Sequence, residues 1–357
     1  MKKIIGIGIL FLSLLVMTAC GGGDNKSSGD SNSGSSSNNG ETITLKAAVA
    51  YSSSSAQTQF VEWLADEVEE KSDGRLKIDI FPEAQLMPGN QEIPAMLEGQ
   101  IDMNHASSGV ATSFEPSWYV FDMPYIFKFD NTDPSVYVNN KRAFLNMENG
   151  GKLIEKKMEE RGIKVIAHTM TGFQYGFFTS STDNKITDVD SIDGLKIRIN
   201  GGTYVPEMLQ NVGASGMNIT GAELTPALQQ GVIDGLITDV LYAYDAKLPV
   251  KTLTPMPVAN HSNAILMSLE KFNSLPEDLQ QILVDAGKAL EAYSDEYSID
   301  RGKTAFEDFE KEGVEVYLPT QDELDDWEKD LTPIWDEFVK NVDDGDKLIE
   351  AVKENLE

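Results

Sequence analysis

The residues of this chain that could do covalent or metal chemistry are few and scattered. His105, His168 and His261 lie far apart, at spacings that match no metal site. The only cysteine is Cys20, and the sequence has no G-x-S-x-G, no H-E-x-x-H and no P-loop. The 188–193 segment is similar to a calcium loop, but an isoleucine occupies one ligand position, so we expect a solvated turn. We therefore predict no enzyme, no catalytic residue, no metal and no cofactor.

Cys20 instead points to export. Lys2 and Lys3 precede an apolar run over 4–16, and small residues lead from that run to Cys20. The run is shorter than the roughly 20 residues that a membrane-spanning helix needs, so 1–19 is predicted to be a signal peptide. The boundary resembles a lipobox, which implies cleavage before Cys20 and acylation of its thiol, as by palmitate. The alternative is a plain secreted protein with a stray cysteine in its signal peptide.

The segment after Cys20 has the composition of a flexible linker. Residues 21–40 are almost wholly Gly, Ser, Asn and Asp, which cannot bury apolar surface. A coil of this length reaches on the order of 25 Å. Residues 20–40 are therefore predicted to be a lipid-anchored linker. It would hold the folded part at the outer face of the cytoplasmic membrane, on the periplasmic side if the cell has two membranes.

The charge balance excludes some partners. The chain has 29 basic and 58 acidic residues, a formal charge of −29, so nucleic acid and anionic membrane surfaces are not expected to bind it. A single cysteine allows no disulfide within the chain, and stability must come from core burial. If the ligand is an anion, the overall field opposes it, and a specific local cation must bind it.

Alternating and helical patterns predict an α/β fold in the part after the linker. Apolar residues alternate over 43–49, recur at helical spacing from Phe60 to Val68, and alternate again over 76–80. This β-α-β order predicts a partly parallel sheet with helices on its faces. We also expect helices near 90–98, 151–161 and 222–230, and strands at 101–103, 163–167, 175–179 and 195–199.

A long helical pattern follows near the C-terminus. The 274–277 segment reads as a capping box with a proline in the first turn, and apolar residues then recur at helical spacing to Gly313. One helix of about 37 residues is unusual and could run across two lobes. The alternative is two helices broken near Gly302. A further capped helix is expected from Thr320 through Trp335.

Six segments resemble the solute-binding proteins of TRAP transporters (tripartite ATP-independent transporters) of the C4-dicarboxylate (DctP) type. They occur in the order and at the spacing of that family. In chain order they are 65–75 (ADEVEEKSDGR), 81–86 (FPEAQL), 99–103 (GQIDM), 121–127 (FDMPYIF), 194–198 (GLKIR) and 227–235 (ALQQGVIDG).

The resemblance implies a fold and a mechanism. The fold would be α/β with two lobes of the periplasmic-binding-protein (Venus flytrap) kind, linked by crossing strands and a long helix. The expected division is 41–168 with 258–300 for lobe I, and 169–257 with 301–357 for lobe II. A small organic acid would bind in the cleft of a monomer, the lobes would close over it, and the closed form would dock on the membrane subunits of a TRAP permease for ion-driven import.

Arg198 is the ligand anchor that the resemblance implies. In the family, the arginine of the GLK-x-R segment pairs with the ligand carboxylate. A guanidinium suits this role because its planar fork of donors matches two carboxylate oxygens and stays charged when buried. The alternation of Leu195, Ile197 and Ile199 places Arg198 on the opposite face of the strand.

Other family positions are changed. Gln174 stands where many relatives have a second arginine, and Thr238 stands where an asparagine is common. The aromatic residue that often precedes the ALQ helix is replaced near Gly221. These departures favour a monocarboxylate or a bulkier organic acid, and they disfavour sialic acid. The remaining lining candidates are Phe173, Asn200, Ser107, Ser108 and Tyr242.

Three other functions remain open from the sequence. The first is a ligand-sensing module that signals to a membrane receptor. The second is a binding protein of an ATP-driven sugar or peptide importer, which the GLKIR context of Arg198 disfavours. The third is a secreted hydrolase, which the lack of a nucleophile–base constellation disfavours.

Overall fold

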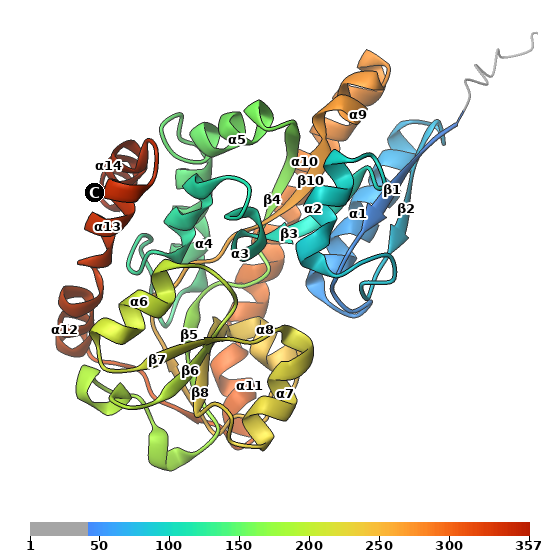
Figure 1. The fold of residues 1–357 in the computed structure, drawn as a ribbon. Helices are drawn as coiled ribbons and strands as arrows, with labels where there is room; N and C mark the ends of the chain where they lie inside the picture. The colour runs from blue at the N-terminus through green and yellow to red at the C-terminus, as the bar shows by residue number, and fades with distance from the viewer. Residues whose placement is uncertain (1–41) are drawn as a thin grey trace, which may run out of the picture. The chain divides into compact units, whose positions relative to one another are not determined.

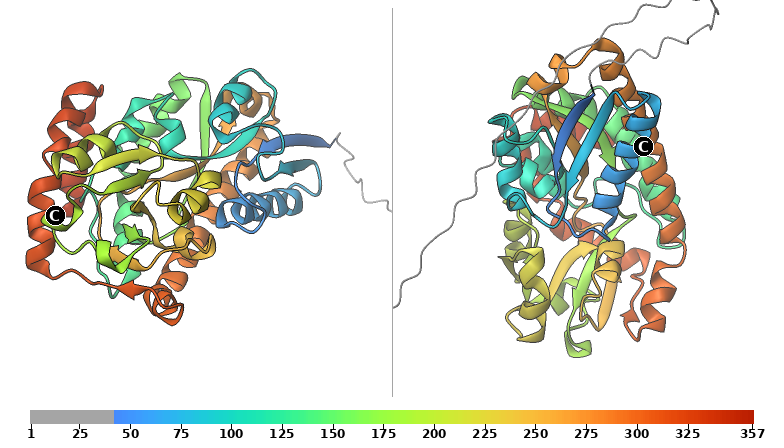
Figure 2. Two further views of the ribbon diagram at one scale, coloured as in Figure 1. Left: turned by 60° about the horizontal axis from the view of Figure 1, so that its bottom comes forward. Right: turned by 90° about the vertical axis from the view of Figure 1, so that its right-hand side faces the viewer.

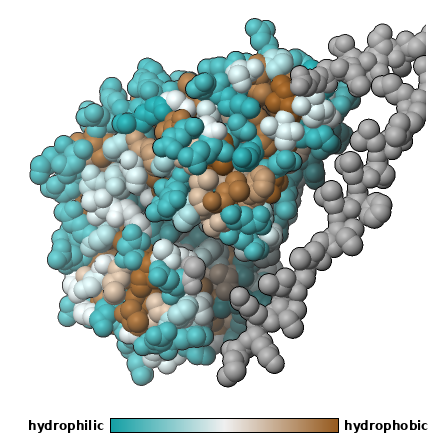
Figure 3. Space-filling model, turned by 45° about the vertical axis from the view of Figure 1, so that its right-hand side comes forward, coloured by the Kyte–Doolittle hydropathy of each residue, from teal (hydrophilic) through white to brown (hydrophobic). Residues whose placement is uncertain are grey.

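The computed structural model describes residues 42–357, which fold around two β-sheets (Figure 1). The expected signal peptide, the linker and Cys20 lie outside the described residues. Within 42–357, no helix is both long enough and apolar enough to cross a membrane. On the face shown in Figure 3, hydrophilic residues predominate and hydrophobic residues form separate small groups.

The first sheet has the strand order β2-β1-β3-β10-β4. Its strands are β1 (Ile43–Ala48), β2 (Leu76–Phe81), β3 (Met103–Ser107), β4 (Ile163–Thr169) and β10 (Asn263–Ser268). Strands β1 and β2 pair in parallel and are joined by α1 (Ala56–Lys71), which confirms the predicted β-α-β unit. The start predicted for the strand at 101–103 is wrong. Strand β3 begins only at Met103, which is the first of its residues to pair with β1.

The second sheet has the strand order β11-β9-β5-β8-β6-β7. Its strands are β5 (Tyr175–Thr179), β6 (Lys196–Ile199), β7 (Ser215–Asn218), β8 (Gly235–Asp239), β9 (Thr252–Pro255) and β11 (Glu315–Val316). Strand β8 lies between β5, which runs antiparallel to it, and β6, which runs parallel. We call the parts built on the two sheets the first and second lobes. Their residue boundaries along the chain stay a prediction.

The connections between strands are mostly short helices. They are α2 (Gly89–Leu97), α3 (Ser108–Ala111), α4 (Pro134–Asn146), α5 (Gly151–Glu160), α6 (Tyr204–Asn211), α7 (Gly221–Gln229), α8 (Val240–Asp245) and α9 (Leu269–Ser274), with 3-10 turns η1 (Pro116–Asp122), η2 (Thr182–Asn184) and η3 (Val189–Ile192). The segment that is similar to a calcium loop forms η3, whose N-terminus Asp188 caps. No group of three or more potential metal ligands comes together within 42–357.

The long C-terminal pattern forms two helices. Helix α10 (Glu277–Gly302) packs on β4 so closely that a Cβ at Gly287 would lie 2.2 Å from the backbone oxygen of Ile166. The chain then breaks before α11 (Ala305–Lys311), so a single helix to Gly313 is wrong and the alternative of a break near Gly302 is confirmed. Figure 2 shows α10 running along the side of the molecule past both sheets.

The predicted capping box at 274–277 is also wrong. The hydroxyl of Ser274 donates to the backbone oxygen of Lys271 within α9, and α10 begins after Pro276 without a side-chain cap. By contrast, the capping box of Thr320 and Glu323 forms as predicted and starts α12 (Gln321–Leu331). That helix does not reach Trp335, because the chain breaks at Pro333.

The last two helices are α13 (Ile334–Asn341) and α14 (Gly345–Leu356). They bring the C-terminal segment against both lobes. Asn355 and Asn140 of α4 exchange side-chain-to-backbone hydrogen bonds of 2.9 Å in each direction. The ring of Phe338 packs at 6.0 Å from that of Tyr204 in the second lobe.

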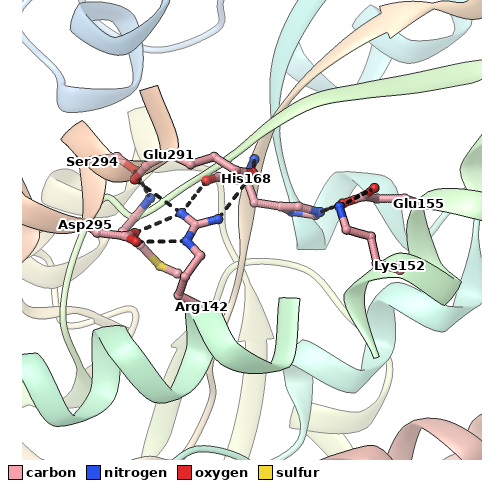
Figure 4. Close-up of polar contacts among 8 residues, drawn as sticks. Arg142, Lys152, Glu155, His168, Glu291, Ser294 and Asp295 are labelled. Atoms are coloured by element: carbon pink, nitrogen blue, oxygen red, sulfur yellow. Dashed lines mark hydrogen bonds and ion pairs between the residues drawn. The ribbon is translucent and has the colours of Figure 1, made fainter. Parts of the chain in front are cut away.

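A part-buried ion-pair cluster joins α4, β4 and α10 (Figure 4). The Arg142 guanidinium donates to both carboxylate oxygens of Asp295 at 2.8 Å and to the backbone oxygen of His168 at 2.8 Å. Its Nη1 lies 3.2 Å from the carboxylate of Glu291, which also accepts the His168 N–H. The cluster fixes the long helix to the first lobe.

Candidate ligand-binding site

Arg198 lies in β6, between β7 and β8. Its strand neighbours Ile197 and Ile199 are buried on the other face of the sheet, as the alternation predicted. The side chain of Arg198 is itself only 2% exposed. The strand therefore carries a cation into a largely dehydrated place.

The partners of Arg198 are neutral. Its Nε donates to the backbone oxygen of Ile219 at 2.8 Å, and its Nη2 donates to Oδ1 of Asn200 at 3.3 Å. No carboxylate of residues 42–357 forms an ion pair with it. The other four arginines of the sequence are paired: Arg75 with Asp278, Arg142 with Glu291 and Asp295, Arg161 with Glu115, and Arg301 with Asp245.

This difference matters because acidic residues outnumber basic ones two to one, 58 to 29. A buried cation without an anion pays a desolvation penalty that a bound anion would offset. Three of the five N–H groups of a guanidinium remain after the two hydrogen bonds to Ile219 and Asn200. Arg198 can therefore still offer a fork of donors to a carboxylate.

Three tyrosine phenols lie close enough to this cation to affect its pKa. Burial lowers the pKa of Arg198, and the nearby phenols of Tyr242, Tyr175 and Tyr51 partly offset that effect. Burial raises the pKa of Tyr51 to about 12, although a hydrogen bond with the Ser107 side chain acts to lower it. Tyr51 follows β1 and Ser107 ends β3, so both belong to the first lobe. Tyr175 in β5 and Tyr242 in α8 belong to the second lobe. The two lobes thus both contribute to the surroundings of Arg198.

The lobes touch beside the site at a glycine. A Cβ at Gly109 of α3 would lie 2.4 Å from the backbone oxygen of Asn200, which directly follows β6. Tyr119 and Thr203 form a second bridge, with 2.9 Å between their hydroxyl oxygens. The absence of a side chain at Gly109 is therefore a condition for this close approach.

A cavity of ≈ 60 Å³ lies at the same junction. Its walls come from the segment after β1, from Thr171 and from α8. The lining residues are Ser52, Ser54, Ser55, Ala56, Gln57, Thr171, Tyr242, Asp245 and Ala246. Tyr242 thus connects this cavity to the surroundings of Arg198.

Gln174 directly precedes β5, and Asp239 is the last residue of β8. Gln174 is 1% exposed; its Nε2 donates to Oδ1 of Asn131 at 2.9 Å, and its buried Oε1 has no partner among the described residues. Asp239 lies opposite Tyr175 in the β5–β8 register, and burial raises its pKa to about 6. Burial lowers the pKa of nearby Lys141 to about 7, and its Nζ donates to the backbone oxygens of Asn260 and His261.

The structure brings some of the predicted lining residues to Arg198. Asn200 contacts its guanidinium, and Tyr242 and Ser107 belong to its surroundings through the phenols described above. Phe173 packs instead in the apolar core, with its ring 5.7 Å from that of Phe306. The Oγ of Ser108 accepts the backbone N–H of Ser262, and Thr238 is buried within β8. A ligand role for each of them stays a prediction.

Sequence reasoning missed Tyr51, Tyr175 and Asp239. Tyr51 lies in the loop after β1, Tyr175 begins β5, and Asp239 ends β8. A position at the end of a strand was the available signal, since ligands of open α/β sheets bind beyond strand ends. The sequence does not show which of these strand ends lie next to one another in the folded protein.

Residues 47–341 match the family described as bacterial extracellular solute-binding protein, family 7 (DctP). The chain belongs to this family. It is thus a solute receptor of the TRAP type rather than an enzyme, and its two-lobed α/β fold with a long helix is the fold of that group. The expected recognition and fold class are confirmed.

Known relatives agree over most of the chain. It is 26% identical over 299 residues to the C4-dicarboxylate-binding periplasmic protein DctP of Rhodobacter capsulatus, covering 81% of this chain and 84% of that one. A TRAP periplasmic solute-binding protein of Sulfurospirillum deleyianum with bound succinate has a TM-score of 0.74 at 22% identity, over 87% of this chain and 98% of that one. DctP6 of Bordetella pertussis, a receptor binding pyroglutamic acid, has a TM-score of 0.77 at 21% identity, over 87% and 100%.

Proposed function

We propose that this receptor binds a small organic acid by its carboxylate, with Arg198 as the anchor. The observation that carries the proposal is that Arg198 is buried and has no carboxylate partner among residues 42–357, while the other four arginines are ion-paired. A carboxylate at the free N–H groups would complete the site, because a guanidinium binds two carboxylate oxygens in one plane. Relatives that bind succinate and pyroglutamic acid support this ligand class.

The bound receptor then delivers its ligand to the membrane subunits of a TRAP permease, which imports it along an ion gradient. Membership of the TRAP receptor family supports this step. We further propose that Cys20 carries a lipid and that residues 20–40 hold the monomeric receptor at the outer face of the cytoplasmic membrane. The test is mass spectrometry of the protein from its own membranes: a lipid on Cys20 that is lost in Cys20→Ser supports the anchor, and an unmodified Cys20 contradicts it.

The ligand proposal is tested by isothermal titration of residues 41–357 with mono- and dicarboxylates. Arg198→Met removes the cation and keeps much of the side-chain volume. We expect the variant to bind at least 100-fold more weakly, since truncating one partner of a buried charge pair costs about 2–5 kcal/mol. Arg75→Met, which removes a part-exposed arginine paired with Asp278, is the control and should bind like the wild type. Equal binding by Arg198→Met would reject Arg198 as the anchor.

A further inference from the structure

One side chain fixes the orientation of the Arg198 guanidinium. The Nη2 of Arg198 donates to Oδ1 of Asn200 at 3.3 Å, and its Nε donates to the backbone oxygen of Ile219 at 2.8 Å. No residue of 42–357 accepts a hydrogen bond from its Nη1, so that nitrogen keeps both of its N–H groups. Asn200 thus holds the cation and leaves part of it open to a carboxylate.

Asn200 begins the 200–203 loop, which leads from β6 to α6. Gly201 and Gly202 have φ angles of +80° and +87°, which residues with a Cβ rarely adopt. The backbone N–H of Gly201 donates to Oδ1 of Asn218 at the end of β7, at 3.1 Å. The path of the loop therefore depends on its two glycines and on one hydrogen bond to the neighbouring strand.

The first lobe lies directly against the backbone of this loop. A Cβ at Gly109 of α3 would lie 2.4 Å from the backbone oxygen of Asn200. A Cβ at Gly202 would lie 2.3 Å from Oδ2 of Asp122, the last residue of η1. Each lobe thus contributes a glycine that allows the other to approach.

A hydrogen bond closes the far end of the same contact. The hydroxyl oxygens of Tyr119 in η1 and Thr203 lie 2.9 Å apart, and the ring of Tyr119 packs edge-to-face on that of Tyr204 at 5.1 Å. Tyr119 belongs to the first lobe, whereas Thr203 and Tyr204 belong to the second. This hydrogen bond forms only while the two lobes are in contact at the loop.

The loop therefore makes two contacts at once. The side chain of Asn200 accepts from Arg198, while the loop backbone lies against α3 and η1 of the first lobe. If the first lobe moved away, the backbone of Asn200 would lose the support that keeps its side chain against the guanidinium. Two contacts that share one element support each other, and this linkage is reciprocal.

We propose that Asn200 is a positioning residue for the ligand carboxylate, and that the 200–203 loop couples carboxylate binding at Arg198 to contact with the first lobe. This inference rests on the proposed function, because it takes Arg198 as the carboxylate anchor. Tyr119 forms no hydrogen bond with Arg198, yet it should contribute to the affinity for any carboxylate.

Isothermal titration of residues 41–357 tests the coupling. The probe is whichever of acetate, lactate, succinate and pyroglutamate binds the wild type most tightly. Tyr119→Phe and Thr203→Val each remove one hydroxyl of the bridge with little change of shape. Each variant should bind the probe about threefold to tenfold more weakly, the effect of one neutral hydrogen bond. The double variant should bind no more weakly than either single one, because all three lack the same bond.

Substitutions at Asn200 test the positioning role. Asn200→Asp and Asn218→Asp keep the side-chain size and add the same charge beside β6, but only residue 200 contacts the guanidinium. Asn200→Asp should pair with Arg198 and weaken probe binding at least tenfold more than Asn218→Asp does. Without ligand, Asn200→Asp should unfold at no lower a urea concentration than the wild type, an opposite effect that a merely structural residue would not give.

The outcomes separate this inference from the proposed function. If Tyr119→Phe and Thr203→Val bind the probe as tightly as the wild type, or if Asn200→Asp weakens binding no more than Asn218→Asp, the inference is overturned. If none of the four acids binds, or if one binds wild type and Arg198→Met equally well, the proposed anchor fails, and the inference fails with it. If Arg198→Met abolishes binding but the loop variants change nothing, the function stands and only the inference falls.

Discussion

At the scale of single residues, Arg198 and Arg142 are the same residue type with opposite electrostatic surroundings. Arg198 is buried and Arg142 is part-buried, but Arg142 has two carboxylate partners and Arg198 has none among residues 42–357. The desolvation penalty of a buried charge is offset when the protein supplies a partner of opposite charge. For an unpaired buried charge, this penalty remains until an anion binds. This contrast supports the proposal that Arg198 is a ligand anchor, whereas Arg142 has a structural role.

The contrast predicts different stabilities for the same substitution. Arg142→Met leaves Glu291 and Asp295 without their cation, so it should lower the free energy of unfolding by about 3–5 kcal/mol. Arg198→Met removes an uncompensated charge and should leave the ligand-free protein at least as stable as the wild type. Urea unfolding without ligand measures both. A loss of several kcal/mol in Arg198→Met would mean that Arg198 has a structural partner.

Glu92 predicts a pH dependence of stability. It is 1% exposed, burial raises its pKa to about 8 from 4.5, and the Asn104 side chain donates to it. The folded state binds this proton more tightly than the unfolded state does. The contribution of Glu92 to the free energy of unfolding is therefore fully present below pH 4.5, and it falls as the pH rises toward 8. Nearby His105, whose pKa burial lowers to about 3, stays neutral across this range.

Glu92→Gln keeps the shape and removes the proton. The stability of the wild type relative to this variant should therefore fall by a few kcal/mol, as an order of magnitude, between pH 5 and pH 8. Urea unfolding of both proteins at the two pH values gives this difference and cancels the titration of other groups. A difference that does not change with pH would show that Glu92 is not buried as a neutral acid.

At the scale of elements, local sequence patterns predicted most strands and helices, but they did not fix where one helix ends and the next begins. The β-α-β unit at the start was predictable because its alternation is local. The break after α10 was predicted only as an alternative to one long helix, because it depends on contacts made by Gly302: a Cβ there would lie 2.6 Å from Pro134 and 2.9 Å from the ring of Phe173. Likewise, Arg198 was predictable from its segment, but Tyr51 and Tyr175 come near it only through the tertiary fold.

The α3–β6 contact gives a prediction at this scale. Gly109→Ala would push a methyl group into the backbone oxygen of Asn200 and hold the lobes apart. We expect ligand affinity to fall at least tenfold, while the unfolding of the ligand-free protein stays close to that of the wild type, because the clash is confined to the α3–β6 contact. Titration and urea unfolding check the two parts. Ser113→Ala, an exposed position just after α3, serves as the control.

Unchanged affinity in Gly109→Ala would contradict the view that this contact belongs to the ligand-bound arrangement. A large loss of stability would instead assign the contact to the folding of the protein as a whole.

At the scale of the whole molecule, we propose that a strongly acidic protein binds an anion by keeping a buried arginine unpaired. The formal charge of −29 opposes an anionic ligand everywhere except where a local cation outweighs it. The buried Arg198, reached from both lobes, is such a place.

The most direct test of this account is a crystal structure of residues 41–357 with the tightest-binding acid from the titrations. The account predicts a carboxylate whose two oxygens lie about 2.7–2.9 Å from the Arg198 guanidinium, with Tyr51 and Tyr175 beside it. A ligand whose carboxylate is bound elsewhere, with Arg198 still bonded only to Ile219 and Asn200, would contradict it.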